Sequence, residues 1–349
     1  MKDWKKLAVK SSASIIETMK NIDNTSSQFA VVVDEYLRLL GTVTDGDIRR
    51  GILKGVSLED AISKIMNRNP VTIHKGVSKK TIEELFRKKK LRHLPVISNT
   101  GEVVDIYLSE EYIEPLGLDN WVVLMAGGLG TRLRPLTEET PKPMLKVGTK
   151  PILQTILESF IDYGFHNFYF SVNYKRESIK TYFGDGNDWG VSINYLDEDQ
   201  KLGTAGALSL FKNVPTKPII VMNGDILTKV NFKQLLDFHE ENKSMATMCV
   251  REFHYQVPYG VVKTNGTHLT GIEEKPTESY FVNAGIYVLN PKVLKMIPNC
   301  QYYDMPTLFE KLINDNLTTS VFPIREYWLD IGKMNDFEKA NIEYPGVFE

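Results

Sequence analysis

The segment LMAGGLGTRLRPLT, which covers residues 124–137, is the most informative part of this chain. Its first two residues end the apolar run at residues 121–125, which is typical of a buried strand. Glycines in such a place leave backbone N–H groups open to a phosphate, because no Cβ blocks the approach. We therefore predict a phosphate-binding loop, and its candidate residues are Ala126, Gly127, Gly128, Gly130 and Thr131.

Two cations accompany this loop. Arg132 carries a forked guanidinium suited to phosphate oxygens, and Lys142, in the sequence PKPML at residues 141–145, adds a second positive charge. The pattern lacks the third glycine of a dinucleotide-binding fingerprint and is not a Walker loop. An ordinary strand-to-helix turn with surface cations is the alternative, and the length of the compound pattern disfavours it.

Beyond this segment, apolar strand-like runs alternate with helical patterns. Such alternation predicts a mostly parallel sheet with helices on both faces, as in Rossmann-like α/β folds. Residues 246–289 are rich in strand patterns broken by glycines, so we expect an antiparallel portion there and a mixed sheet overall. The predicted strands are residues 168–172, 191–196 and 218–222, and the predicted helices are residues 152–163, 205–211, 232–241, 304–314 and 333–344.

Two acids stand at the ends of predicted strands. Asp225 follows the apolar run at residues 218–222 and a glycine turn, and ligand sites in open α/β sheets collect at the carboxyl ends of strands. A turn or cap residue is the alternative for Asp225. Asp330 follows buried aromatic residues, where an acid needs a partner or a metal ion. The sequence by itself does not indicate that the two acids meet.

The first third of the chain has the pattern of a repeated unit. Strand pairs are predicted at residues 29–33 and 39–44 and again at residues 93–97 and 103–109, each after a helical stretch. This predicts a small α+β domain. Residues 114–120 hold a proline and a glycine and are predicted as a linker, so that the first domain covers residues 1–117 and the second residues 118–349.

Composition excludes several classes of protein. The 349 residues carry a net charge of −2, which gives no long-range attraction to nucleic acid or to anionic membranes. Two cysteines and no C-x-x-C argue against a disulfide scaffold and against zinc. Neither a signal peptide nor an apolar stretch of about 20 residues is recognisable. We therefore expect a cytoplasmic protein without a nucleic-acid or membrane partner.

Residues 6–113 resemble a tandem pair of CBS domains, a module that often binds adenine nucleotides. The pattern GTVTDGD at residues 41–47 carries the resemblance. It implies that Thr44 and Asp47 contact the ribose and phosphate of a regulatory adenine nucleotide. The same two residues also fit a helix N-cap, and both interpretations stay open. Ser109 and Tyr112 stand at the matching positions of the second repeat, where the acid is missing.

Residues 120–344 resemble the sugar-1-phosphate nucleotidyltransferase family. Five further motifs occur in the family's order: LGTAGA at 202–207, NGD at 223–225, EEKP at 273–276, NAGIY at 283–287 and WLDIG at 328–332. The resemblance implies that Asp225 and Asp330 hold Mg²⁺. It also implies that base and nucleotide contact Gly203 and Thr204, and that the sugar phosphate contacts Gly224, Glu274, Lys275, Asn283 and Gly285.

The implied reaction joins a nucleoside triphosphate to a sugar 1-phosphate and releases pyrophosphate. A sugar 1-phosphate has a second pKa near ~6 and is largely a dianion at pH 7, so no general base is needed. None of the six histidines lies in a motif. Cations must then do most of the catalytic work. We expect Mg²⁺ to bridge the α-phosphate and the sugar phosphate, and the catalytic cations to be Arg132, Lys142 and Lys275.

The base and the sugar are less clearly indicated. Glu198 stands where relatives that bind uracil or thymine carry an amide, and a carboxylate accepts from the two adjacent donors of guanine. A solvated loop acid is the alternative. Leu129 and the fused CBS pair resemble the glucosamine-1-phosphate guanylyltransferases of legionaminic acid synthesis. We expect GTP, glucosamine 1-phosphate and a homo-oligomer.

Three other functions stay open. The first is thymidylyl or uridylyl transfer to glucose 1-phosphate, and the second is guanylyl transfer to mannose or heptose 1-phosphate. The third is a nucleotide-sensing protein with an inactive transferase domain. The presence of every expected site residue argues against the third, because loss of catalysis normally removes such residues.

Overall fold

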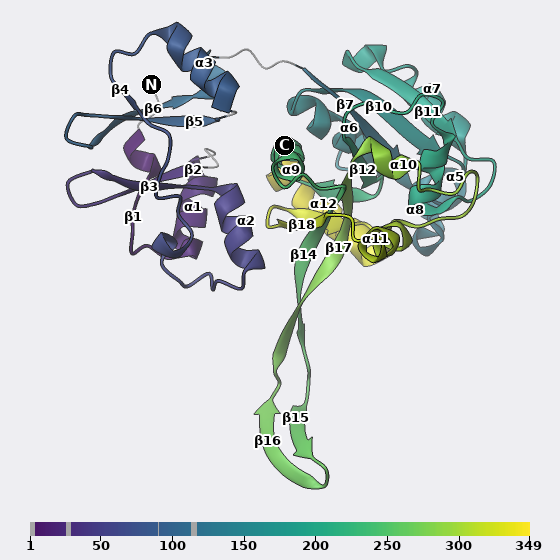
Figure 1. The fold of residues 1–349 in the computed structure, drawn as a ribbon. Coiled ribbons are helices and arrows are strands. Elements are labelled where there is room, and N and C mark those ends of the chain that lie inside the picture. Colours follow the sequence, from purple (N-terminus) through teal and green to yellow (C-terminus); the bar gives the residue numbers. More distant parts are fainter. Residues whose placement is uncertain (1–3, 26–28, 90, 113–116) are drawn as a thin grey trace. The chain divides into compact units, whose positions relative to one another are not determined.

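A computed structural model describes residues 4–25, 29–89, 91–112 and 117–349. The chain divides into two compact units, Met1–Leu116 and Gly117–Glu349, which are drawn in Figure 1. Within the described residues, every helix is too short or too polar to span a bilayer. Of the predicted linker, residues 114–116 lie outside the described residues. Its last three residues, 118–120, belong to a strand instead, because Leu118 pairs with Phe165 of the neighbouring strand of the second unit.

The first unit contains the same arrangement twice. In each copy a short strand pairs in parallel with a second strand, which pairs antiparallel with a third. The predicted repeat is confirmed, but the two short first strands were not predicted because three or two residues show no period. The strands are β1 (Ala8–Lys10), β2 (Phe29–Val33), β3 (Leu39–Thr44), β4 (Ile73–His74), β5 (His93–Ile97) and β6 (Val103–Leu108). The helices are α1 (Ile15–Thr25), α2 (Asp45–Leu53), α3 (Lys79–Lys89) and α4 (Ser109–Tyr112).

One buried hydrophobic cluster joins the two copies. Phe29 and Val31 of β2 are buried in one cluster with Val103 and Ile106 of β6. The ring of Phe29 stacks on that of His93, with ring centroids 4.2 Å apart. Burial of such side chains stabilises the unit by about 1.5–3 kcal/mol each, so this shared cluster favours the pair of copies over either copy alone. Each copy also has a buried cluster of its own.

The second unit is built on a seven-stranded mixed sheet. Its strand order is β11-β10-β7-β12-β17-β14-β18. The central strand β7 is parallel to β10 and β12, and β17 runs antiparallel to β12 and β14. The predicted fold class is therefore confirmed. The bounds are β7 (Leu118–Met125), β10 (Phe165–Val172), β11 (Ser192–Asp197), β12 (Ile219–Asn223), β14 (Ala246–Gln256), β17 (Thr277–Leu289) and β18 (Thr319–Ile324).

Helices cover both faces of this sheet. Along β7, Val122 and Leu124 are buried in one core and Val123 in the other, as the alternation of side chains along a strand requires. This double burial explains the uninterrupted apolar run that precedes the glycine loop. The main helices are α6 (Ile152–Asp162), α7 (Arg176–Phe183), α9 (Phe232–Glu241), α11 (Met305–Asn314) and α12 (Met334–Phe348). The helix predicted at residues 205–211 is split into α8 (Gly203–Gly206) and a 3₁₀ turn (Ala207–Leu210), because Gly206 within it favours helix poorly.

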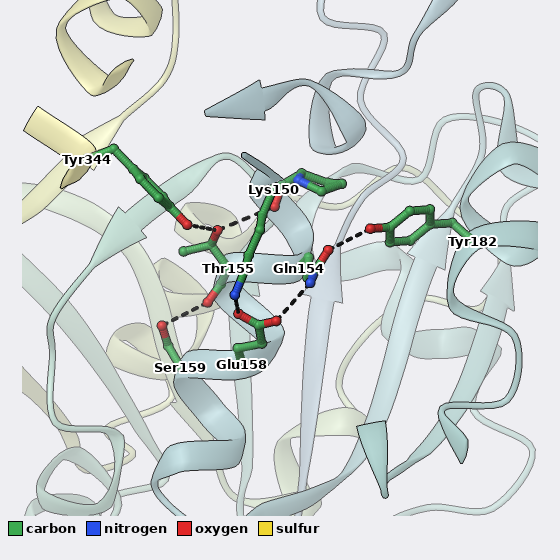
Figure 2. A network of polar contacts seen from close by, with 8 residues as sticks. Lys150, Gln154, Thr155, Glu158, Ser159, Tyr182 and Tyr344 are labelled. Atoms are coloured by element: carbon green, nitrogen blue, oxygen red, sulfur yellow. Dashed lines mark hydrogen bonds and ion pairs between the residues drawn. The ribbon is translucent and has the colours of Figure 1, made fainter. Parts of the chain in front are cut away.

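A polar network fastens α6 to two other helices, as Figure 2 shows. The hydroxyl of Tyr182 in α7 donates to Gln154, and Gln154 donates to Glu158 at 2.8 Å. On the other side of α6, the hydroxyls of Thr155 and Tyr344 are 3.0 Å apart. Because Tyr344 is buried in α12, this contact holds the C-terminal helix against the body.

Strands β14 and β17 continue beyond the sheet as a two-stranded arm, which Figure 1 shows extending from the second unit. The arm ends in the hairpin of β15 (Gly260–Asn265) and β16 (His268–Glu274). All residues from 252 to 283 are at least partly exposed. The antiparallel pairing predicted for residues 246–289 is confirmed, but its extension away from the body was not predicted.

Candidate active site

The candidate site lies at the carboxyl ends of β7 and β12. Met125 and Asn223 are paired at these ends, and the amide of Gly224 donates to the carbonyl of Met125 at 2.9 Å. A Cβ at Gly224 would lie 2.7 Å from that carbonyl oxygen, so the close approach requires glycine. The loop after β7 and the turn that carries Asp225 therefore start side by side, as the α/β fold predicts.

The glycine loop connects β7 to a short 3₁₀ turn, Thr131–Leu133. Ala126 is buried and donates to the carbonyl of Ser171 on β10, which holds the start of the loop against the sheet. Gly130 has a φ of 61°, and a Cβ there would lie 2.9 Å from the Cβ of Lys142. Gly128 and Thr131 are exposed, so this part of the loop is accessible to a ligand.

Two carboxylates meet beside the loop. Asp225 precedes β13 (Ile226–Thr228), and Asp330 ends β19 (Trp328–Asp330); in this two-stranded sheet Ile226 is paired with Asp330. The amide of Ile331 donates to the backbone carbonyl of Asp225 at 3.0 Å. The two acids thus come from segments about a hundred residues apart in the chain.

Two cations complete the cluster. The ammonium group of Lys142, a residue that is only 7% exposed, forms an ion pair with Asp225 Oδ2. A Cβ built at Gly332 would lie 3.7 Å from Arg132 Nη1 and 3.8 Å from Asp330 Oδ1, so Arg132 and Asp330 face the same point. Partial burial and then the charge of Asp225 raise the pKa of Asp330, while Lys142 and Arg132 lower it.

The donor atoms fit a magnesium ion. Asp225 Oδ1 is buried and has no hydrogen-bond partner among the residues described, and the same holds for the amide oxygen of Asn223 next to it. Nowhere in the described ranges do three acidic, histidine or cysteine side chains gather as a complete metal site. Mg²⁺ commonly takes one or two carboxylates and completes its shell with substrate phosphates and water, so two acids suffice for it.

Glu198 lies on the other side of the glycine loop. It is 7% exposed; Ser171 Oγ donates to its Oε1 at 2.5 Å and the amide of Leu202 donates to its Oε2 at 3.1 Å. A Cβ at Gly127 would lie 2.9 Å from Oε1. The alternative of a solvated loop acid is therefore wrong. Ser171 was not predicted, although a polar residue near the end of an apolar strand is a usable signal.

The segment after Leu202 is shaped by a residue that was not predicted. Gly203 has a φ of 79°, and the amide of Thr204 donates to Asp304 Oδ1 at 2.9 Å. Thr204 Oγ1 in turn accepts from the amide of Met305, the first residue of α11. Asp304 therefore positions the predicted base-binding turn. The sequence signal is an acid directly before a Met-Pro helix start.

Two predicted sugar-binding residues lie where the arm leaves the body. Gly285 has a φ of 71°, and a Cβ there would lie 2.6 Å from Ile226 Cδ1 and 2.8 Å from Asn223 Nδ2. Asn283 accepts from the amide of Gly285 at 2.9 Å and donates to the hydroxyl of Tyr287 at 2.8 Å. The root of the arm is thus packed against the turn that carries Asp225.

The structure does not bring Glu274 and Lys275 to this cluster. Both lie on the arm and are exposed, and Lys275 has a φ of 48° at the break between β16 and β17. From Thr277 to Gly285 the chain is one continuous strand, which spans about 26 Å at the usual rise per residue.

In the first unit, Thr44 and Asp47 form a capping box at the start of α2. The amide of Thr44 donates to Asp47 Oδ2 at 2.8 Å and the amide of Asp47 donates to Thr44 Oγ1 at 3.2 Å. Arg50 pairs with Asp47 Oδ1 at 2.8 Å. The helix-cap interpretation is confirmed, and the nucleotide site stays a prediction. Tyr112 of the second repeat packs on Phe86, with ring centroids 5.8 Å apart.

Comparison with known proteins identifies the domains. The family model for nucleotidyl transferases matches residues 121–345, and the CBS domain model matches residues 4–54 and 62–111. The chain is similar to a mannose-1-phosphate guanyltransferase of Debaryomyces hansenii, with 32% identity over 238 residues that cover 64% of each protein. It is also similar to a UTP–glucose-1-phosphate uridylyltransferase of Synechocystis, with 33% identity over 256 residues, 64% of this chain and 66% of the relative.

Another relative is the mannose-1-phosphate guanylyltransferase catalytic subunit beta of Drosophila melanogaster, 36% identical over 227 residues that cover 62% of this chain and 60% of the relative. The chain thus spans slightly less than two thirds of the length of these relatives. Among solved structures it resembles HddC from Yersinia pseudotuberculosis, with 26% identity, a TM-score of 0.51 and coverage of 64% of this chain and 99% of HddC. The chain belongs to the nucleotidyl transferase family and carries a pair of CBS domains before its transferase domain.

Proposed function

We propose that this protein transfers a nucleoside monophosphate from a nucleoside triphosphate to a sugar 1-phosphate. The observation that carries the proposal is the cluster of two cations and two carboxylates beside the glycine loop, at the ends of β7 and β12. In the reaction, a phosphate oxygen of the sugar 1-phosphate forms a bond to the α-phosphorus. The bond between that phosphorus and the β-bridging oxygen breaks, and pyrophosphate leaves.

Each group of the cluster has a task that follows from its charge and place. The nucleophile is already a dianion, so the main obstacle is repulsion between two anions. Arg132 and Lys142 reduce this repulsion by holding the triphosphate and the departing pyrophosphate. Asp225 and Asp330 would hold Mg²⁺, and a bound magnesium ion supplies further charge neutralisation.

The base we propose is guanine. The support is the buried carboxylate of Glu198 beside Gly127, together with the guanylyl transfer named for two of the relatives. Each carboxylate oxygen already accepts one hydrogen bond and retains a lone pair. Uracil or thymine would turn a carbonyl oxygen toward the same carboxylate, which disfavours those bases.

Glu198→Gln should lower kcat/KM for GTP by about 10–100-fold, roughly 1.5–3 kcal/mol, because one charge-assisted acceptor is lost. It should also raise the relative use of UTP and dTTP, since an amide can donate. The matched control is Asp199→Asn. Asp199 is the next residue in the chain, and its side chain is 93% exposed. Steady-state kinetics with the three triphosphates measures both effects. An unchanged preference for GTP in the Gln variant would leave Glu198 a purely structural residue.

The sugar we propose is glucosamine 1-phosphate, for the synthesis of a surface glycan or of legionaminic acid. The support is the resemblance of the CBS–transferase arrangement to that group of enzymes. One experiment tests the base and the sugar together. The full chain is incubated separately with each combination of one triphosphate (GTP, UTP or dTTP) and one sugar 1-phosphate (of glucosamine, glucose, mannose or heptose). The product masses would show GDP-glucosamine as the main product, and a different main product would replace this assignment.

The first unit should bind one adenine nucleotide per chain. Thr44 and Asp47 are both present in the first repeat, whereas Tyr112 takes the acid's position and packs on Phe86 in the second. Calorimetric titration of residues 1–116 with AMP, ADP and ATP measures the stoichiometry. Asp47→Ala should abolish binding and Tyr112→Phe should not. A stoichiometry of two, or no heat with any of the three, would refute the prediction.

The second unit should keep its activity alone. Residues 117–349 contain the whole mixed sheet, both of its cores and all residues of the acid–cation cluster. A fragment of these residues should therefore fold and retain kcat within about threefold, an effect below 1 kcal/mol. Circular dichroism and pyrophosphate release test it. A folded but inactive fragment would mean that the CBS unit contributes to the site.

A further inference from the structure

The arm of the second unit exposes apolar side chains that a lone hairpin cannot bury. In the proximal part, Phe253 is paired with Tyr280 and Tyr255 with Glu278, which places Phe253, Tyr255 and Tyr280 on one face. Each of these three is more than 50% exposed. Near the tip, Val262 is paired with Ile272, and both are again more than half exposed.

Such an arm needs a partner surface. An isolated two-stranded hairpin is marginally stable in water, and its exposed apolar face favours a contact that covers it. The exposed half of an aromatic side chain is roughly 100 Å², so the two faces of one arm together offer about 700 Å² of apolar surface. Two arms used reciprocally offer about 1,400 Å², which lies in the size range of stable protein interfaces. The side chains are Phe253, Tyr255, Tyr259, Val262, Leu269, Ile272, Tyr280 and Phe281.

The same arm holds Lys275 far from the acid–cation cluster of its own chain. Gly285 contacts Asn223 and Ile226, which flank Asp225, so the root of β17 marks the position of the site. Lys275 lies beyond Thr277, at the far end of a strand segment of about 26 Å. A lysine side chain reaches only a fraction of this length, so Lys275 cannot touch the acid–cation cluster of its own chain while the arm is extended.

We propose that two copies of this chain exchange their arms, so that each arm lies on the body of the other copy and brings Lys275 to the other copy's glycine-loop site. The second copy is the occupant that fits, because it offers a site of the same kind from which Lys275 is missing. Exchange of an identical element is also a low-cost route to a closed dimer. The break at Lys275 and Pro276 presents the ammonium group at a bend of the arm instead of within a regular ladder.

The chemical consequence rests on the proposed transfer function. Each site of the dimer would take Arg132, Lys142 and both carboxylates from one chain and Lys275 from the other. Lys275 would supply a positive charge for the sugar phosphate, which has two negative charges. A site assembled in this way is complete only in the dimer, so activity should depend on protein concentration near the dissociation constant.

Mixing two inactive variants tests the exchange directly. Asp225→Asn impairs the body and Lys275→Ala impairs the arm; each variant alone should be nearly inactive. In a mixed dimer with exchanged arms, one of the two sites combines an intact body with an intact arm. Random mixing puts half of the chains in mixed dimers, so the mixture should recover about one quarter of wild-type activity. Lys263→Ala, which changes another exposed lysine of the same arm, is the control and should keep full activity.

The mass of the assembly gives a second, independent result. Sedimentation equilibrium of the wild type should give twice the chain mass of 39.8 kDa. Phe253→Ser with Tyr280→Ser should give the mass of one chain and leave the circular dichroism unchanged, because both side chains lie outside the two cores of the body.

Each outcome has a definite meaning. A wild-type dimer with no recovery in the mixture would overturn the exchange. A wild-type monomer would also overturn it, in favour of an arm that folds back or binds another protein. A third outcome is a wild-type dimer that the Ser variant dissociates but that reacts with no substrate pair. The contact between the arms would then stand, whereas the proposed transfer function and the role of Lys275 in it would both be refuted.

Discussion

Asp225→Asn will lower kcat by about 10³-fold, equivalent to about 4 kcal/mol, with a smaller change in the dissociation constant of the nucleotide. The reason is that the carboxylate pairs with Lys142 and keeps a second, buried oxygen without a hydrogen-bond partner among the described residues. An amide at this position offers a weaker oxygen ligand and no negative charge for a metal ion. Asp330→Asn should have an effect of the same order, because its oxygen faces the same point as Arg132.

Turnover at saturating Mg²⁺ measures this prediction. Asp188→Asn is the matched control and should leave kcat unchanged. Asp188 is exposed, lies in a 3₁₀ turn, and is more than 30 residues from either acid in the sequence. Titration with Mn²⁺, followed by the paramagnetic relaxation of water protons, gives a readout that does not depend on catalysis. Near-normal turnover and unchanged Mn²⁺ binding in both Asn variants would remove the metal assignment.

Lys142→Met will lower both activity and stability. The substitution keeps the packing of the buried side-chain stem but removes the charge opposite Asp225. Loss of one partner of a largely buried ion pair leaves an uncompensated carboxylate, which should cost about 2 kcal/mol of unfolding free energy after allowance for the partial exposure of Asp225. The activity should fall by about 10²–10³-fold, because a cation that holds the triphosphate is lost.

A double variant separates the two effects of Lys142. In Lys142→Met with Asp225→Asn, no buried charge is left alone, so chemical denaturation should show most of the lost stability restored. Activity should stay as low as in the worse single variant, because both residues act in the same site. If the double variant is as unstable as the sum of the single variants, the pair is not coupled and the cost of Lys142→Met is only a packing defect.

The local parts of the site could be predicted from the sequence. The glycine loop, Arg132 and Lys142 stand within about twenty residues, and the buried strand before them has a clear apolar pattern. The meeting of Asp225 and Asp330 could not be derived in this way, because it depends on the pairing of β13 with β19 across about a hundred residues. Only the family resemblance placed the two acids together, and the structure agrees with that placement.

The burial of Glu198 and the direction of the arm are two further features that could not be predicted from the sequence. The neighbours Asp197 and Asp199 give Glu198 the composition of a solvated loop, and only the contacts with Ser171 and Leu202 reveal its burial. The strand pattern of residues 246–289 is the same whether the hairpin covers its own body or extends from it. Local pairing determines the ladder, whereas the direction of the arm depends on contacts that no short pattern encodes.

The central claim is nucleotidyl transfer at the acid–cation cluster, and pyrophosphate release by the full chain tests it most directly. With Mg²⁺, GTP and glucosamine 1-phosphate together, the wild type should release pyrophosphate in equal amount to the nucleotide sugar formed. Omission of the sugar phosphate should stop the release, because the sugar phosphate is the nucleophile, and Asp225→Asn should slow it about 10³-fold. Absence of pyrophosphate with every triphosphate and sugar phosphate tested, or undiminished release by Asp225→Asn, would contradict the account.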